Sequence, residues 1–186
     1  MHVPVTLASW MIGDGAVAFP ADGDRVDIVL GFAPAQGNDL PEMCITAAAE
    51  VVLLGGGGIT TPHPALVHFS TFTAVAHNAT SLNATSLHQG ESTLYGRLHV
   101  DYEMTAATVP RVLGTVLRRR LITEVRAPRA HRQPPSYELS DINTRRTKFA
   151  DSALAAVGER DTGQRGPQPQ ETWRRDTGLL LDVEIE

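Results

Sequence analysis

The most regular stretch of this chain reads Leu94-Tyr95-Gly96-Arg97-Leu98-His99-Val100-Asp101-Tyr102-Glu103-Met104. Apolar or small residues occupy every second position, and most residues between them are polar or charged. Because successive side chains of a strand point to opposite faces, this period of two predicts a half-buried β-strand. The same period, rather than a helical one, dominates the rest of the chain.

Two more stretches alternate clearly, at residues 25–32 after an Asp22-Gly23-Asp24 turn and at residues 179–186. Less regular strand candidates are residues 3–12, 44–54, 66–76, 112–125 and 136–142. Three consecutive alanines at 47–49 make a short helix an alternative for the second of these. One helix is predicted over residues 149–157, which are rich in alanine and are followed by Gly158 as a helix stop.

Many short strands separated by turns, with one short helix, predict an all-β fold that is mainly an antiparallel sandwich or a small barrel. The 186 residues suit one domain, so residues 1–186 are expected to form a single β-rich unit. Residues 159–178 are rich in Gly, Pro, Gln and Arg and show no periodicity, which predicts a mobile excursion. Residues 179–186 then return as a C-terminal strand.

Positive charge is concentrated in residues 111–148. This segment holds ten Arg or Lys and three acidic residues, a net charge of +7, whereas the whole chain carries −5. Opposite charge blocks either pair with each other or face a partner. If they are exposed, these side chains form a surface for an anionic partner, made of Arg111, Arg118, Arg120, Arg126, Arg129 and Arg132.

Arg119 is the exception within the strand expected at 112–125. The alternation places Leu113, Leu117 and Leu121 on the inner face, and Arg119 falls on that face as well. An unpaired buried charge is costly. We therefore expect either a β-bulge near Arg118-Arg119 that turns the side chain outward, or a buried acid that pairs with it.

The arginines have two other uses. They can pair with acidic residues of the flanking segments or across a homo-oligomer interface. They can also contact phosphate backbones in a salt-dependent way, but aromatic residues are only 5% and the total charge is negative, which disfavours nucleic acid. A protein partner or a small acidic ligand is the favoured contact.

A metal site is a further alternative. His99 and Asp101 are two residues apart in a predicted strand and therefore share a face. With a distant histidine, such a pair can hold a transition metal and leave coordination positions open. His131 is the third-ligand candidate, and His68, His77 and His88 are others. The competing interpretation is a solvated polar face with cross-strand charge pairs.

The remaining features limit the kinds of function that the sequence allows. Neither the Gly55–Gly58 run nor the Asp-Thr-Gly triplets at 161–163 and 176–178 lie in the context that catalysis needs, so loops and turns are expected there. No apolar run approaches the roughly 20 residues of a membrane helix. Cys44 is the only cysteine, which favours a reducing compartment, and arginine outnumbers lysine fifteen to one, as in high-GC bacteria. The sequence therefore predicts a cytoplasmic, non-catalytic binding or accessory module without a cofactor, and identifies no catalytic residue.

Overall fold

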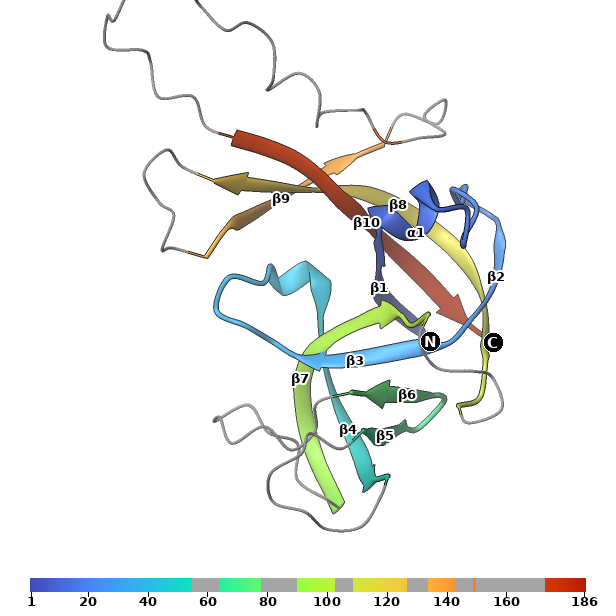
Figure 1. The fold of residues 1–186 in the computed structure, drawn as a ribbon. Helices are drawn as coiled ribbons and strands as arrows, with labels where there is room; N and C mark the ends of the chain where they lie inside the picture. The colour runs from blue at the N-terminus through green and yellow to red at the C-terminus, as the bar shows by residue number, and fades with distance from the viewer. Residues whose placement is uncertain (55–63, 78–89, 103–108, 127–133, 143–148, 150–172) are drawn as a thin grey trace, which may run out of the picture.

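The computed structural model describes residues 1–54, 64–77, 90–102, 109–126, 134–142, 149 and 173–186. Within these residues almost all regular structure is β-strand (Figure 1), which confirms the all-β prediction. In chain order the elements are β1 (His2–Ala8), α1 (Ser9–Gly13), β2 (Arg25–Ile28), β3 (Leu30–Pro34), the 3-10 turn η1 (Pro41–Met43), β4 (Cys44–Leu53), β5 (Ala65–Phe69), β6 (Thr73–Ala76), β7 (Gly90–Val100), β8 (Val112–Arg126), β9 (Ser136–Asp141) and β10 (Trp173–Ile185).

Five of these strands close into a barrel. Their order is β4, β5, β6, β3 and β7, and β7 pairs back with β4. All neighbouring pairs are antiparallel except β3 with β6. The rings of Phe32 and Phe69 pack together in the core with their centroids 5.9 Å apart. The barrel is therefore filled by side chains.

The remaining strands extend the sheet away from the barrel. β1 pairs in parallel with β7, and β10, β8 and β2 follow in that order, while β9 pairs with β8. The long strands β8 and β10 run side by side in Figure 1. Leu179 and Leu181 of β10 face the main core, whereas Leu180 packs on the other side against Met43 and Ile122. This part of the sheet is thus covered on both faces.

The segment predicted as one strand at 25–32 is two strands. Val29 interrupts it, because Val29 and Leu30 are both buried but belong to different apolar clusters. β2 pairs with β8, whereas β3 pairs with β7 and β6. One short segment therefore connects the barrel to the outer strands.

A β-bulge lies in β8. Asp182 of β10 stands opposite Arg118 and the next residue, Val183, stands opposite Val116, so Leu117 is an extra residue. A bulge of this kind reverses which side chains face inward on its two sides. The bulge was expected one or two residues later in the chain.

The predicted inner face of β8 was therefore wrong before the bulge and right after it. Val112 and Val116 are buried, while Leu113 and Leu117 are exposed. Beyond the bulge Leu121 is buried as expected. A single inserted residue explains the error, because alternation counted along the chain cannot detect a change of register.

Other expectations were met in part. Residues 44–53 form a strand and not a helix, residues 65–76 form the hairpin β5–β6, and β1 is followed by the short helix α1. β10 begins at Trp173, so the end of the expected excursion is strand. Asp176-Thr177-Gly178 does not form the expected turn, because it lies within β10. A register shift there leaves Thr177 as an extra residue of the strand. Residues 150–157 of the expected helix, and 159–172 of the excursion, lie outside the described residues.

Candidate functional site

The arginines that β8 was predicted to direct outward are paired within the chain. Arg118 donates to Asp141 of β9 at 2.6 Å, and Arg120 donates to Asp182 of β10 at 3.0 Å. Arg126 donates to Glu124 of its own strand. Each carboxylate comes from β8 or from a strand that pairs with it, so sheet formation itself brings these opposite charges together.

Arg119 is buried, with 6% of its surface exposed. Its Nη1 donates to the carbonyl of Pro20 at 2.7 Å, and its Nε lies 3.6 Å from the Asp22 carboxylate. Its guanidinium also lies over the Phe19 ring, 5.5 Å from the centroid. The side chain therefore faces inward. One expectation was a buried acid beside it, and Asp22 does lie there, but half of its side chain is exposed.

Arg111 lies apart from the other arginines, just before β8. Its Nε donates to the Asp27 carboxylate at 2.6 Å, and its Nη2 donates to the Asp27 backbone carbonyl. Arg129 and Arg132 lie outside the described residues. The four described members of the predicted surface, Arg111, Arg118, Arg120 and Arg126, thus all have carboxylate partners.

The metal site considered as an alternative, with His99, Asp101 and His131, can be compared with the structure only in part. Asp101 accepts a hydrogen bond from Nε2 of His77 at 2.5 Å, and its carboxylate side chain is only 3% exposed rather than solvated. Among the described residues, no three His, Cys, Asp or Glu side chains are close enough together to hold a metal ion. His131 lies outside these residues.

The imidazole of His99 lies against the backbone of the neighbouring strand. His99 and Gly31 are register partners in β7 and β3. Burial lowers the pKa of His99 below its usual 6.5, and Arg97 and His77 lower it further, although the Asp101 charge opposes them. The folded protein therefore disfavours protonation of the His99 ring.

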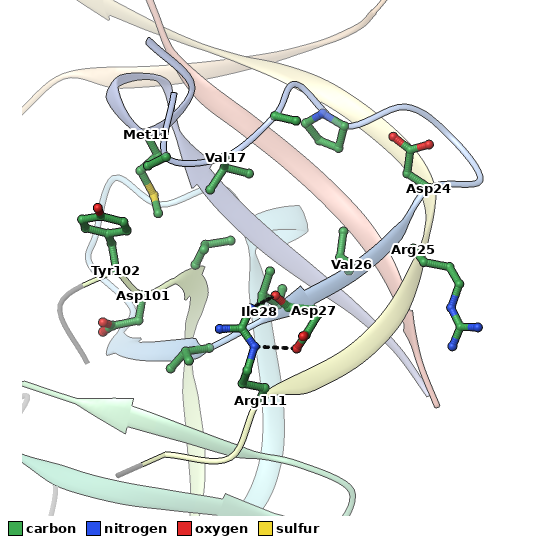
Figure 2. Close-up of a pocket in the computed structure, with 15 residues that line it drawn as sticks. Met11, Val17, Asp24, Arg25, Val26, Asp27, Ile28, Asp101, Tyr102 and Arg111 are labelled. Atoms are coloured by element: carbon green, nitrogen blue, oxygen red, sulfur yellow. Dashed lines mark hydrogen bonds and ion pairs between the residues drawn. The ribbon is translucent and has the colours of Figure 1, made fainter. Parts of the chain in front are cut away.

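A groove of about 750 Å³ lies beside β2. Its walls come from the segment between α1 and β2, from β2 itself, from the end of β7 and from Arg111. Figure 2 shows Met11 and Val17 on one side, Tyr102 and Asp101 on another, and Arg111 bonded to Asp27 on a third.

No family model, curated protein or solved structure matches this chain.

The apolar part of the groove is continuous with the core. Met11 and Val29 are buried, and Val17, Val26 and Ile28 are partly buried around them. A volume between roughly 300 and 1,000 Å³ with mainly apolar walls and a few placed polar groups is typical of ligand sites. The groove has both properties.

The charged groups of the groove are mainly acidic. Asp24, Asp27 and Asp101 line it together with Arg25 and Arg111. Arg25 donates to Glu186 at 2.7 Å, and Figure 2 shows its side chain directed away from the groove. Asp24 accepts the backbone N–H of Ala21 at 2.7 Å, so its carboxylate is fixed in place.

An exposed aromatic pair stands at the rim. Tyr102 is 62% exposed, and its ring meets Trp10 edge-on with centroids 5.9 Å apart. The alternation in residues 94–104 placed Tyr102 inside and Asp101 outside, and the structure reverses both. β7 ends at Val100, so the strand period no longer applies to the two residues that line the groove.

Sequence reasoning missed the groove because its walls come from four separate segments. Arg111 is its only residue from the predicted arginine surface. The break in the alternation at Val29 was a usable signal, since three consecutive apolar residues, Ile28 to Leu30, mark the point where the strand divides. In the described part of the chain, no helix is long and apolar enough to cross a membrane.

Proposed function

We propose that this protein is a non-catalytic binding module whose ligand lies in the groove beside β2. The observation that carries the proposal is a cavity of about 750 Å³ that combines an apolar floor with fixed charged groups. The polar groups are held by their own contacts before a ligand arrives, as Arg111 is by Asp27 and Asp24 by Ala21. Binding therefore costs little reorganisation of the site.

The groove favours a ligand with positive charge. Three carboxylates line it against two arginines. Arg111 pairs with Asp27, and Arg25 is engaged by Glu186 on the outside, so negative charge is in excess. The exposed ring of Tyr102 offers a further surface for a cation, worth about 0.5–1 kcal/mol at exposed sites. We infer that the ligand has an apolar body and a basic group, and not the acidic group expected from the arginine-rich sequence.

The test uses two fluorescent probes of opposite charge. Dansylcadaverine carries an aromatic ring and an ammonium group, and dansylglycine carries the same ring and a carboxylate. We expect fluorescence anisotropy to show dansylcadaverine binding about tenfold more tightly. Equal binding of the two probes would contradict the charge argument, and absence of any binding would contradict the groove as a site.

Two tyrosines provide matched variants for this experiment. Tyr102→Ala should weaken dansylcadaverine binding about threefold, because it removes the aromatic rim. Tyr95 is 52% exposed and lies outside the groove lining, so Tyr95→Ala should leave binding unchanged. An equal effect of both variants would place the probe elsewhere.

A protein partner at the arginine surface is the second candidate. Arg126 lies over the partly exposed ring of Trp173, 5.9 Å from its centroid, and Arg and Trp are frequent at the centre of protein interfaces. Exposed ion pairs are weak, so these arginines can exchange intramolecular carboxylates for those of a partner. Retention on immobilised polyglutamate, lost in Arg118→Glu/Arg126→Glu, would support this candidate. Preferential retention on duplex DNA would instead favour nucleic acid.

We also propose the cytoplasm as the compartment. The support is compositional: Cys44 is the only cysteine of the sequence, and disulfides are typical of oxidising compartments. A fusion of the chain to a fluorescent protein, located by microscopy in a bacterial host, would test this.

A further inference from the structure

The groove borders an edge of β2 that has no strand partner among the described residues. β7 pairs with one edge of β3, and the last bond of this ladder joins the N–H of Asp101 to the carbonyl of Val29 at 2.9 Å. β2 precedes β3 in the chain and lies in line with it, on the other side of Val29. β7 ends at Val100, so it pairs with β3 and does not extend along β2. Within the described residues, β2 pairs only with β8, on its opposite edge. The edge of β2 on the β7 side therefore borders the groove.

The backbone groups on this edge can be assigned from the register. The N–H of Val116 donates to the carbonyl of Asp24 at 2.9 Å, so Asp24 faces β8. Because hydrogen-bonding direction alternates along an antiparallel pair, Val26 and Ile28 also face β8, and Arg25 and Asp27 face the other way.

The position of Arg111 supports this assignment. Its Nη2 donates to the carbonyl of Asp27, which therefore does not point into the ladder with β8. Three backbone groups remain on this edge without a strand partner among the described residues: the N–H and carbonyl of Arg25 and the N–H of Asp27. They are spaced as an added strand requires.

We infer that the ligand of the groove is an extended peptide segment of a partner protein, which adds as a further strand to the edge of β2 that is unpaired within the described residues. This inference rests on the proposed function and names the ligand class. Strand addition is a common mode of peptide recognition, in which backbone hydrogen bonds give affinity and alternate side chains give specificity. Arg111 limits the added strand by occupying the Asp27 carbonyl.

The lining of the groove also predicts which types of side chain the peptide carries. Side chains of a strand alternate between faces, so every second residue would enter the groove against Val17, Val26 and Ile28. Medium-sized apolar residues suit this partly buried surface. The carboxylate of Asp24 at the end of β2 favours a lysine or arginine next to them. The expected partner segment therefore alternates apolar and basic residues.

The test uses the synthetic peptide acetyl-Lys-Val-Lys-Val-Lys-Val-amide and hydrogen exchange of single amides, measured by NMR on the full chain. Saturating peptide should slow the exchange of the Arg25 and Asp27 amides about tenfold or more. The amides of Val26 and Ile28 already bond to β8 and serve as internal controls that should change little. Binding without protection of Arg25 and Asp27 overturns the inference.

Two methylated peptides make the test independent of side chains. One carries N-methyl groups on the valine amides and the other on the lysine amides, so charge and side chains are the same. Since alternate N–H groups of a strand face opposite edges, only one of the two should lose affinity, by about tenfold. Equal affinities, or equal losses, contradict strand addition.

Competition with dansylcadaverine separates the two proposals. A peptide that displaces the probe and shows the alternating methylation effect supports both. Probe binding that the peptide cannot displace leaves the groove as a ligand site and overturns the peptide as its ligand. If neither the probe nor the peptide binds, the groove itself is not the site and both proposals fail.

Discussion

The imidazole of His99 packs directly on Gly31, the residue opposite it in the neighbouring strand. A Cβ atom added at Gly31 would lie 2.2 Å from Nε2 of His99, far inside van der Waals contact. The ring thus occupies the space that any other residue at position 31 would fill. This contact lies beside Val29, where the barrel strand β3 gives way to β2.

Gly31→Ala should destabilise the fold. The added methyl group must displace the His99 ring from a closely packed position, and overpacking of this kind costs about 1–3 kcal/mol. Urea unfolding would measure the loss. Gly13→Ala is the matched control, because no atom lies within 4 Å of the added Cβ there. The double variant Gly31→Ala/His99→Ala should recover part of the loss, and failure to recover any would show that the ring is not the obstacle.

The stability should depend on pH through His99. Its pKa is lowered in the folded state, mainly by burial, so the unfolded chain takes up the proton more readily. The contribution of His99 is therefore constant above its unfolded pKa of about 6.5 and becomes unfavourable as the pH falls through that value. The loss is complete once the pH is below the folded pKa.

The variant His99→Gln isolates this contribution from other titrating groups. We expect the unfolding free energy of the original protein, relative to His99→Gln, to fall between pH 8 and pH 5. Parallel curves over that range would mean that His99 has the same pKa in both states.

Substitution by methionine should lower the stability of the fold much more at Arg119 than at Arg118. Arg119→Met keeps the apolar stem but leaves the Pro20 carbonyl without its buried donor, which costs about 1–3 kcal/mol. Arg118 is exposed and its ion pair with Asp141 is open to solvent, so Arg118→Met should leave the urea midpoint unchanged. Comparable losses in both variants would contradict the burial of Arg119.

Deletion of Leu117 should be far more damaging than its replacement. Removing the bulged residue forces one half of β8 to exchange its inner and outer faces, which would turn Val112 and Val116 outward. Exposure of two buried valines costs about 3 kcal/mol or more. Leu117→Thr keeps the bulge and changes only an exposed side chain, so thermal unfolding should be nearly unaffected. A stable deletion variant would mean that the register of β8 can slip without loss.

The strands could be predicted over stretches in which no extra residue interrupts the alternation. The alternation at residues 94–100 and 179–185 identified the last part of β7 and the last part of β10 with the correct inward-facing residues, because neither stretch contains an extra residue of its own strand. The same rule failed in β8 because one extra residue at Leu117 changes the register. Local patterns contain no signal for the strand that will lie opposite.

The sequence by itself determined the class of the fold, since a period of two over most of the chain can bury apolar side chains only in sheets. It also determined that residues 111–148 carry excess positive charge. Only the tertiary structure decided what these charges do, because the carboxylates of Asp27, Asp141 and Asp182 reach the arginines from other strands. The groove likewise exists only in three dimensions, where four separate segments of the chain come together around β2. Strand pairing is set by contacts between residues far apart in the chain, and no local stretch of sequence encodes them.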